Sequence, residues 1–217
     1  MKKKKIYVYA ISKNEEKFAK RWYESVKSAD GIYVLDTGST DNTVKILKEL
    51  GAKVTTKEIK PWRFDVARNE SLKLVPLDAD ICVCIDIDEV ISPGWREKLE
   101  EILENEKVNH VRYIYNWSHD ENKNPKVSFY YEKIHARKNF KWINPVHEVL
   151  KYTGSNEVWA TTNDIIVDHY PDSSKSRSSY LPLLELSVKE DPYNDRNVHY
   201  LGREYMYYGK LNEAIDT

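Results

Sequence analysis

Three features are scarce in this sequence, and each absence narrows the class of protein. Only two of the 217 residues are cysteines, so the fold is not held by a disulfide framework. No apolar run approaches the roughly 20 residues that cross a bilayer, and the first residues lead into a strand rather than a signal-peptide core. The formal net charge of -1 excludes a strongly basic nucleic-acid binder. The sequence predicts a cytoplasmic protein without a transmembrane segment or a nucleic-acid partner.

The two cysteines, Cys82 and Cys84, lie two residues apart in an apolar run that reads as a strand. Their side chains therefore point to the same face and are poorly placed to bond to each other, which fits a reducing compartment. A metal site built on them lacks a second cysteine pair. Burial in the core is the favoured interpretation.

The first half of the chain alternates strand patterns with helical patterns. The expected strands are Ile6–Ile11, Gly31–Leu35, Lys53–Thr56 and Ile81–Ile85, and the expected helices are Glu15–Ser28, Asp41–Leu50, Phe64–Leu74 and Gly94–Glu106. This order predicts a parallel sheet covered by helices, whose ligand lies beyond the carboxyl ends of the strands.

After Asn109 the pattern changes to strands rich in aromatic residues, which predicts a mixed or antiparallel extension of the sheet. The strands expected there are Val111–Trp117, Val127–Arg137, Glu148–Tyr152 and Ile165–His169. Helical spacing returns over Ser178–Glu190 and Asn194–Tyr208, and a third helix begins after Gly209. We therefore expect a domain over residues 1–172 and a helical hairpin over 173–217, which is either the start of a TPR-like repeat or a cap on the main domain.

Polar clusters follow three of the expected strands. They are Asn14–Glu16, Asp36–Asp41 and Asp86–Glu89, and all three should meet at one rim of the sheet. Helix capping alone explains the second cluster. Capping explains Asp86 and Asp88 less well, because two carboxylates at the end of an apolar strand form a hard-oxygen site for Mg²⁺ or Mn²⁺ and a bound diphosphate.

These clusters, in this order and spacing, resemble the family 2 glycosyltransferases of GT-A fold. The segments that carry the resemblance are Ile11–Glu16, Val34–Thr43, Ala67–Leu72 and Ile85–Glu89. The resemblance covers about Lys5 to Tyr170, and four motifs in register are far more specific than one Asp-x-Asp pair. It implies an α/β, Rossmann-like mixed sheet flanked by helices, and the transfer of a sugar from a nucleotide-sugar donor.

The resemblance also implies roles for individual residues. Nucleotide binding falls to Ile11, Ser12, Asn14, Glu16, Asp36, Arg68 and Asp86, with Ile11, Ser12 and Asp36 lining a uridine-type pocket. Asp88, Asp86 and His169 are the expected ligands of Mn²⁺ or Mg²⁺, with Asp88 bound most directly. The alternatives are a solvated surface charge for Arg68 and a hydrogen-bonded structural role for His169.

A further segment, Trp142–Glu148, looks like one found in a subset of this family that includes enzymes with helical-repeat tails. Glu148 is the candidate base for an inverting transfer, because a carboxylate has to take the acceptor proton. An ion pair with a nearby Lys or Arg is the competing interpretation. Trp142, His147 and Trp117 are candidates for sugar or acceptor contact, although packing in the core is the safer interpretation for each tryptophan.

Two other functions remain open at this stage. One is a nucleotidyltransferase of related fold, although the glycine-rich loop of that class is missing from Ala10–Asn14. The other is an inactive adaptor that binds a protein through the helical hairpin. The acceptor is a glycan, a lipid-linked glycan or a protein, and the sequence is compatible with a homodimer.

Overall fold

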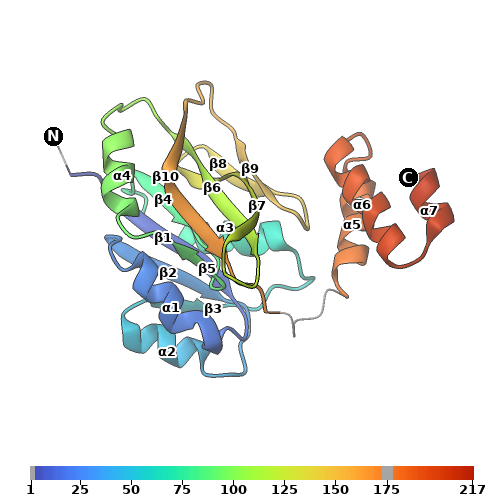
Figure 1. Ribbon diagram of the computed structural model, residues 1–217, viewed down its shortest axis with the longest axis horizontal. Coiled ribbons are helices and arrows are strands. Elements are labelled where there is room, and N and C mark those ends of the chain that lie inside the picture. The colour runs from blue at the N-terminus through green and yellow to red at the C-terminus, as the bar shows by residue number, and fades with distance from the viewer. Residues whose placement is uncertain (1–2, 173–177) are drawn as a thin grey trace.

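The computed structural model describes residues 3–172 and 178–217. Its main feature is an eight-stranded mixed sheet with the strand order β3-β2-β1-β4-β7-β6-β10-β5 (Figure 1). The strands are β1 (Ile6–Ser12), β2 (Gly31–Asp36), β3 (Lys53–Thr56), β4 (Ile81–Cys84), β5 (Glu89–Ile91), β6 (His110–His119), β7 (Pro125–Ala136) and β10 (Trp159–His169). Strands β1 to β4 pair in parallel, whereas β7 runs antiparallel to both β4 and β6. The predicted change from a parallel to a mixed sheet is therefore found.

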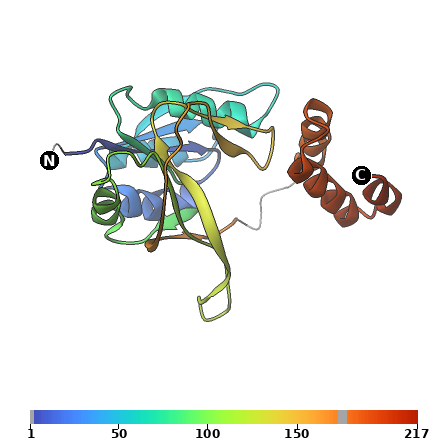
Figure 2. The ribbon, with the colours of Figure 1, turned by 90° about the horizontal axis from the view of Figure 1, so that it is seen from above.

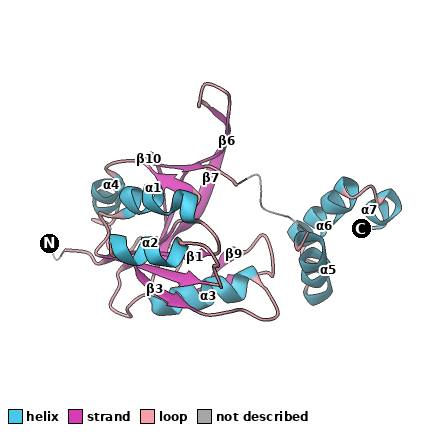
Figure 3. Cartoon of the chain, turned by 90° about the horizontal axis from the view of Figure 1, so that it is seen from below, coloured by secondary structure: helices cyan, strands magenta, loops and turns pink. Residues whose placement is uncertain are grey.

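Helices cover both faces of the sheet (Figure 3). They are α1 (Glu16–Val26), α2 (Thr43–Leu50), α3 (Phe64–Leu74) and α4 (Trp95–Ile102). Val8 of β1 packs in one core cluster with Trp22 of α1 and Leu99 of α4. Its neighbour Tyr9 packs in a second cluster with Leu72 of α3. Because successive strand residues point to opposite faces, α1 and α4 cover one face and α3 covers the other.

The second cluster also contains both cysteines, which are free and fully buried. Burial raises the pKa of each thiol to about 12. The expectation of buried, unpaired cysteines is thus met.

A two-stranded sheet lies beside α3 and consists of β8 (Phe140–Ile143) and β9 (Val149–Tyr152). Asn69 of α3 fixes its position, since the side-chain amide donates to the Trp142 carbonyl at 2.8 Å and its oxygen accepts from the Trp142 N–H at 2.9 Å. The sequence pattern missed β8, and it also missed β5, which is three residues long.

The β6–β7 hairpin extends beyond the rest of the molecule (Figure 2). Its register shifts between the pairs Val111–Ile134 and Tyr113–Tyr131. Over this interval β7 advances one residue more than β6, which is a β-bulge. Bulges redirect side chains near functional sites, and this one surrounds Lys133.

Three helices follow at the end of the chain, namely α5 (Tyr180–Glu190), α6 (Asp195–Tyr207) and α7 (Leu211–Asp216). Leu181, Leu184 and Leu201 from these helices pack against Val146 of the main domain. Residues 173–177, where the sequence predicts that the helical part begins, lie outside the described residues. The relation to TPR repeats stays a prediction. No helix in the described parts of the chain is long and apolar enough to cross a membrane.

Candidate active site

The carboxyl ends of β1 and β2 form one side of the site. Asp36 is fully buried there and accepts hydrogen bonds from the Ser12 hydroxyl at 3.1 Å and from the backbone N–H groups of Gly38 and Ser39 at 3.1 and 3.0 Å. Ile11 packs against Leu35 in a small apolar cluster at the same edge. The predicted pocket residues Ile11, Ser12 and Asp36 are therefore brought together.

Asn14 and Glu16 tie the two neighbouring turns to each other. The Asn14 side chain accepts from the Thr40 N–H at 2.8 Å, and the Glu16 carboxylate accepts from the Asn42 N–H at 2.9 Å. Asn14 also has a positive φ of 55°, which few residues other than glycine, asparagine and aspartate adopt readily. Both side chains thus hold the shape of the rim through backbone amides.

A buried charged cluster lies between α3 and the end of β4. The Arg68 guanidinium, 6% exposed, bonds to both carboxylate oxygens of Asp86, one of them at 2.9 Å from Nη2. Its Nε donates to Glu148 Oε1 at 2.9 Å. The ion pair weighed for Glu148 as an alternative to catalysis is therefore present. A planar guanidinium satisfies two carboxylates in this way because its donors point in fixed directions.

Two members of this cluster, Lys133 and Glu89, were given no role in the site from the sequence. Lys133 Nζ lies 2.7 and 2.8 Å from the two Glu89 oxygens and 3.1 Å from Asp86 Oδ2. The Asp86 N–H also donates to Glu89 at 2.7 Å. Glu89 adjoins the Asp-x-Asp pair, which was a signal in the sequence. No sequence signal pointed to Lys133, because its role depends on the bulge in β7.

Burial and charge act in opposite directions on the pKa values of these groups. Burial would raise the pKa of Asp86, but the charges of Arg68 and Lys133 outweigh it and hold that pKa well below its usual range. Burial also raises the pKa of Glu89, and there it prevails over the attraction of Lys133. For Lys133, the charges of Asp86 and Glu89 outweigh burial and raise the pKa. Asp86 is therefore a firmly ionised partner of two cations.

Asp88 and His169 face each other at the neighbouring strand ends. His169 Nε2 lies 3.4 Å from Asp88 Oδ2, and Nδ1–H donates to the Trp117 carbonyl at 3.1 Å. The bond at Nδ1 directs Nε2 toward Asp88, as second-shell bonds do for histidines that bind metals. Burial would lower the pKa of His169, but Asp88 raises it above the usual value.

These two side chains fit a hard divalent cation as part of an open site. Mg²⁺ takes one or two protein ligands and fills its other positions with water and substrate phosphate, and Mn²⁺ accepts similar oxygen ligands. In residues 3–172 and 178–217, no three histidine, cysteine, aspartate or glutamate side chains converge as a ready cage. Both oxygens of Asp86 are engaged by Arg68 and Lys133. Asp88 is thus the better placed of the two aspartates.

A hollow of about 400 Å³ adjoins His169. It is lined by Phe18, Trp117, Ser118, His119, His169, Tyr170 and Pro171. Trp117 is 50% exposed, whereas Trp142 is 3% exposed and donates from Nε1 to the Tyr9 hydroxyl at 2.9 Å. Of the two tryptophans, only Trp117 has a ring surface open to a ligand. His147 lies elsewhere, stacked against Tyr200 of α6.

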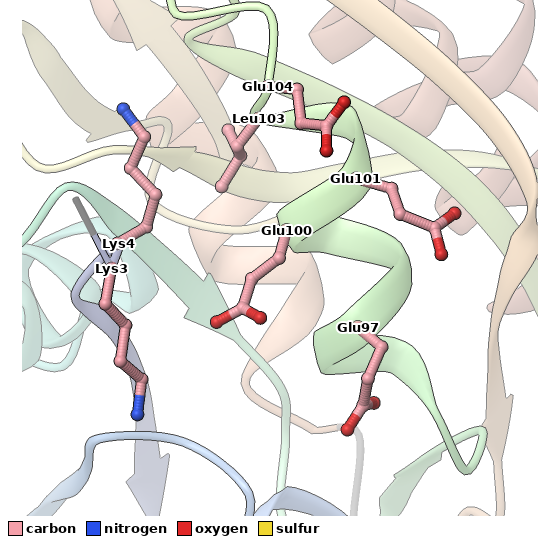
Figure 4. A pocket seen from close by; sticks show the side chains of 7 residues that line it. All are labelled: Lys3, Lys4, Glu97, Glu100, Glu101, Leu103 and Glu104. Atoms are coloured by element: carbon pink, nitrogen blue, oxygen red, sulfur yellow. The ribbon is translucent and has the colours of Figure 1, made fainter. Parts of the chain in front are cut away.

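A second hollow of about 390 Å³ lies at the opposite edge of the sheet (Figure 4). Lys3 and Lys4, just before β1, line it together with four glutamates on and after α4. The carboxyl ends of the parallel strands β1 to β4 lie at the other edge. We therefore place the site at the Asp36, Asp86 and Asp88 rim.

An open α/β sheet with polar residues at its carboxyl edge is the architecture of enzymes that bind nucleotide ligands. The sequence model of glycosyl transferase family 2 matches residues 7–152, and the chain belongs to that family. An uncharacterized glycosyltransferase of Rickettsia typhi is 38% identical over 112 residues, which are 51% of this chain and 36% of that protein. The chain therefore corresponds to much less than the whole of this relative.

The same fold is found in a solved structure. The TarS protein of S. aureus, in complex with UDP-GlcNAc, matches 92% of this chain and 71% of its own with a TM-score of 0.57 and 13% identity. Glucosyl-3-phosphoglycerate synthase from Mycobacterium tuberculosis, in complex with Mg²⁺ and UDP, matches 52% of this chain and 44% of its own, with 26% identity and a TM-score of 0.44. The match to TarS confirms the expected GT-A fold, with its mixed sheet flanked by helices.

Proposed function

We propose that this chain transfers a sugar from a UDP-sugar to an acceptor hydroxyl with inversion at the anomeric carbon. The observation that supports it most is the rim on which Arg68, Asp86, Asp88, His169 and Glu148 meet in a member of glycosyl transferase family 2. The uridine assignment depends on the resemblance at Ile11, Ser12 and Asp36. The acceptor is a glycan, a lipid-linked glycan or a protein.

Mn²⁺ or Mg²⁺, held by Asp88 and His169, would neutralise charge on the departing diphosphate. The Asp36 pocket binds the nucleoside, and the turns joined by Asn14 and Glu16 keep its rim in place. Arg68 holds one oxygen of Glu148 and so orients that carboxylate. The acceptor oxygen forms a bond to the anomeric carbon while the bond between that carbon and the diphosphate oxygen breaks. The acceptor proton passes to Glu148. UDP leaves.

Donor binding is tested first, by calorimetric titration of UDP and GDP with and without Mn²⁺. We expect UDP to bind with metal and the Asp88→Asn variant to lose that metal-dependent binding. Asp120→Asn, in an exposed turn, is the matched control and should bind as the unaltered protein does. Equal binding by Asp88→Asn would remove Asp88 from the metal site, and binding of neither nucleotide would favour the inactive adaptor.

The role of Glu148 is tested separately. Glu148→Gln should still bind UDP with metal, but its transfer rate should fall by roughly 10² to 10⁴ because it cannot accept the proton. Measuring transfer with a panel of UDP-sugars, and UDP release where no acceptor is known, gives the rate. Full activity in this variant would assign the base elsewhere.

A further inference from the structure

The segment Asn144–Glu148, which joins β8 to β9 and ends on the candidate base, has an unusual backbone. Asn144 has a φ of 76° and His147 a φ of 50°. Asparagine adopts this left-handed region readily, but for His147 the conformation carries a steric cost and persists where the surroundings impose it. The contacts of the segment therefore matter for the position of Glu148.

One side of the segment is held by α3. The Phe64 N–H, at the start of α3, donates to the Pro145 carbonyl at 2.9 Å. Four residues further along α3, Arg68 binds the Glu148 carboxylate. These contacts come from the sheet domain itself.

The other side is held by the helices at the end of the chain. The His147 ring stacks on Tyr200 of α6 with ring centres 3.9 Å apart and planes inclined by 15°, and it meets the edge of Tyr180 at 5.7 Å. Arg196 Nη2 donates to the His147 carbonyl at 3.3 Å. Val146 is 1% exposed and packs with Leu184.

We propose that α5 and α6 fix the conformation of Asn144–Glu148, and that Tyr200 is a positioning residue for Glu148. His147 contacts the helices while the next residue, Glu148, contacts Arg68. Because His147 and Glu148 are joined by one peptide bond, a shift of the His147 ring therefore also displaces the Glu148 carboxylate. The helical hairpin then holds the candidate base in position. This inference rests on the proposed function of Glu148.

The experiment compares three variants. Tyr200→Leu keeps apolar bulk without the ring face, Tyr200→Phe keeps the ring, and Tyr207→Ala alters an exposed residue of the same helix. In Tyr200→Leu we expect hydrogen exchange over residues 144–152 and at the Phe64 amide to quicken roughly five- to tenfold. The transfer rate, kcat, should fall on the order of ten- to a hundredfold, because small misplacements of reacting groups are costly.

Other readouts separate positioning from general damage. The affinity for UDP with Mn²⁺ should stay within about twofold in Tyr200→Leu, since the Asp36 and Asp88 rim does not touch α6. Tyr200→Phe should restore both kcat and slow exchange, and Tyr207→Ala should match the unaltered protein.

Unchanged exchange over residues 144–152 in Tyr200→Leu would overturn the inference, and so would a loss of kcat that Tyr200→Phe fails to restore. If the unaltered protein transfers no sugar, the proposed function fails, and the exchange comparison still decides whether α6 fixes the segment. If Tyr200→Leu does not fold, Arg196→Ala is compared in the same way; it removes the bond to the His147 carbonyl and the contact of the guanidinium with the Tyr200 ring, and leaves that ring in place.

Discussion

His135 ends a chain of buried hydrogen bonds that reaches the two-stranded sheet beside the site. Its Nδ1 lies 2.8 Å from the Ala136 carbonyl and therefore carries the proton, so Nε2 accepts from the Tyr9 hydroxyl at 2.8 Å. The Tyr9 oxygen in turn accepts from Trp142 Nε1. This arrangement requires neutral imidazole, and burial accordingly lowers the pKa of His135 from 6.5 to about 3.

A pH dependence of stability follows from that pKa. Between 6.5 and about 3 the unfolded chain holds a proton on His135 that the folded chain does not. The free energy of unfolding should therefore fall by about 1.4 kcal/mol for each pH unit below 6.5. Urea denaturation from about pH 7.5 to pH 5 measures this. His135→Gln should lose that part of the slope, and the exposed His199→Gln should keep it; equal slopes in all three proteins would contradict the argument.

Lys133 offers a second test at the residue scale. Its ammonium group forms an ion pair with the buried Glu89 carboxylate. Removing one partner of a buried ion pair costs about 3–5 kcal/mol, so Lys133→Met should lower the free energy of unfolding by that amount near neutral pH. The pKa of Glu89 is already raised by burial, and it should rise further without Lys133. A raised carboxyl pKa gives stability that is present at low pH and lost as pH rises.

The loss in Lys133→Met should therefore be smaller near pH 4.5 than near pH 7.5. Chemical denaturation at both values measures it. Adding Glu89→Gln should recover part of the loss by removing the unpaired charge, and Lys126→Met, at an exposed position of the same strand, should have little effect. A loss that is independent of pH and of Glu89 would show that Lys133 contributes by packing alone.

At the scale of elements, α2 ends at Gly51, where both the backbone angle and a neighbouring side chain oppose a Cβ. Gly51 has a φ of 110°, and a Cβ there would lie 2.8 Å from the Tyr23 hydroxyl of α1. Gly94 has a φ of 76° with open space around it, so it isolates the backbone effect. Gly94→Ala should cost about 1 kcal/mol, and Gly51→Ala should cost about 1–2 kcal/mol more. Thermal denaturation measures both, and Tyr23→Phe should reduce the excess at Gly51; equal costs would mean that Tyr23 moves freely.

The elements near the start of the chain followed from the sequence because their signals are local. The apolar positions Ala19, Trp22 and Val26 recur at helical spacing and are the buried face of α1. β5, with three residues, is too short to show a clear period, whereas β8 is as long as β3, β4 and β9 and its alternating pattern was overlooked. The order of β6, β7 and β10 depends on pairing between distant residues, which no local pattern records.

The residues of the candidate site also fall into those with a local sequence signal and those that depend on contacts between distant parts of the chain. Asp36, Asp86 and Asp88 follow strands and were found from that position. The pair between Arg68 and Glu148 joins residues 80 apart in the chain, and Lys133 reaches Asp86 through a change of register in β7. Such contacts arise from tertiary packing, so the sequence suggested an ion pair for Glu148 without naming its partner.

At the scale of the whole molecule, two of the contacts that join the terminal helices to the sheet domain can be ranked against each other. One is the ion pair between Arg63 and Glu190, whose side chains are 22% and 43% exposed. The other is the apolar cluster in which Leu184, fully buried, packs against Val146. Exposed ion pairs contribute about 0–1 kcal/mol, whereas truncating a buried leucine to alanine costs about 2–5 kcal/mol. Apolar packing should therefore dominate the junction.

This ranking gives a prediction for how the two parts unfold. Leu184→Ala should lower the free energy of unfolding by about 3 kcal/mol, and a double-mutant cycle on Arg63→Ala and Glu190→Ala should give a coupling below about 1 kcal/mol. Leu211→Ala, at a position 59% exposed in α7, is the control and should change little. Calorimetry should show one transition for the unaltered protein, since helices held by a shared core unfold with it, and a separate early transition in Leu184→Ala. A large coupling for the ion pair, with a small effect of Leu184→Ala, would mean that charge rather than packing joins the helices to the sheet.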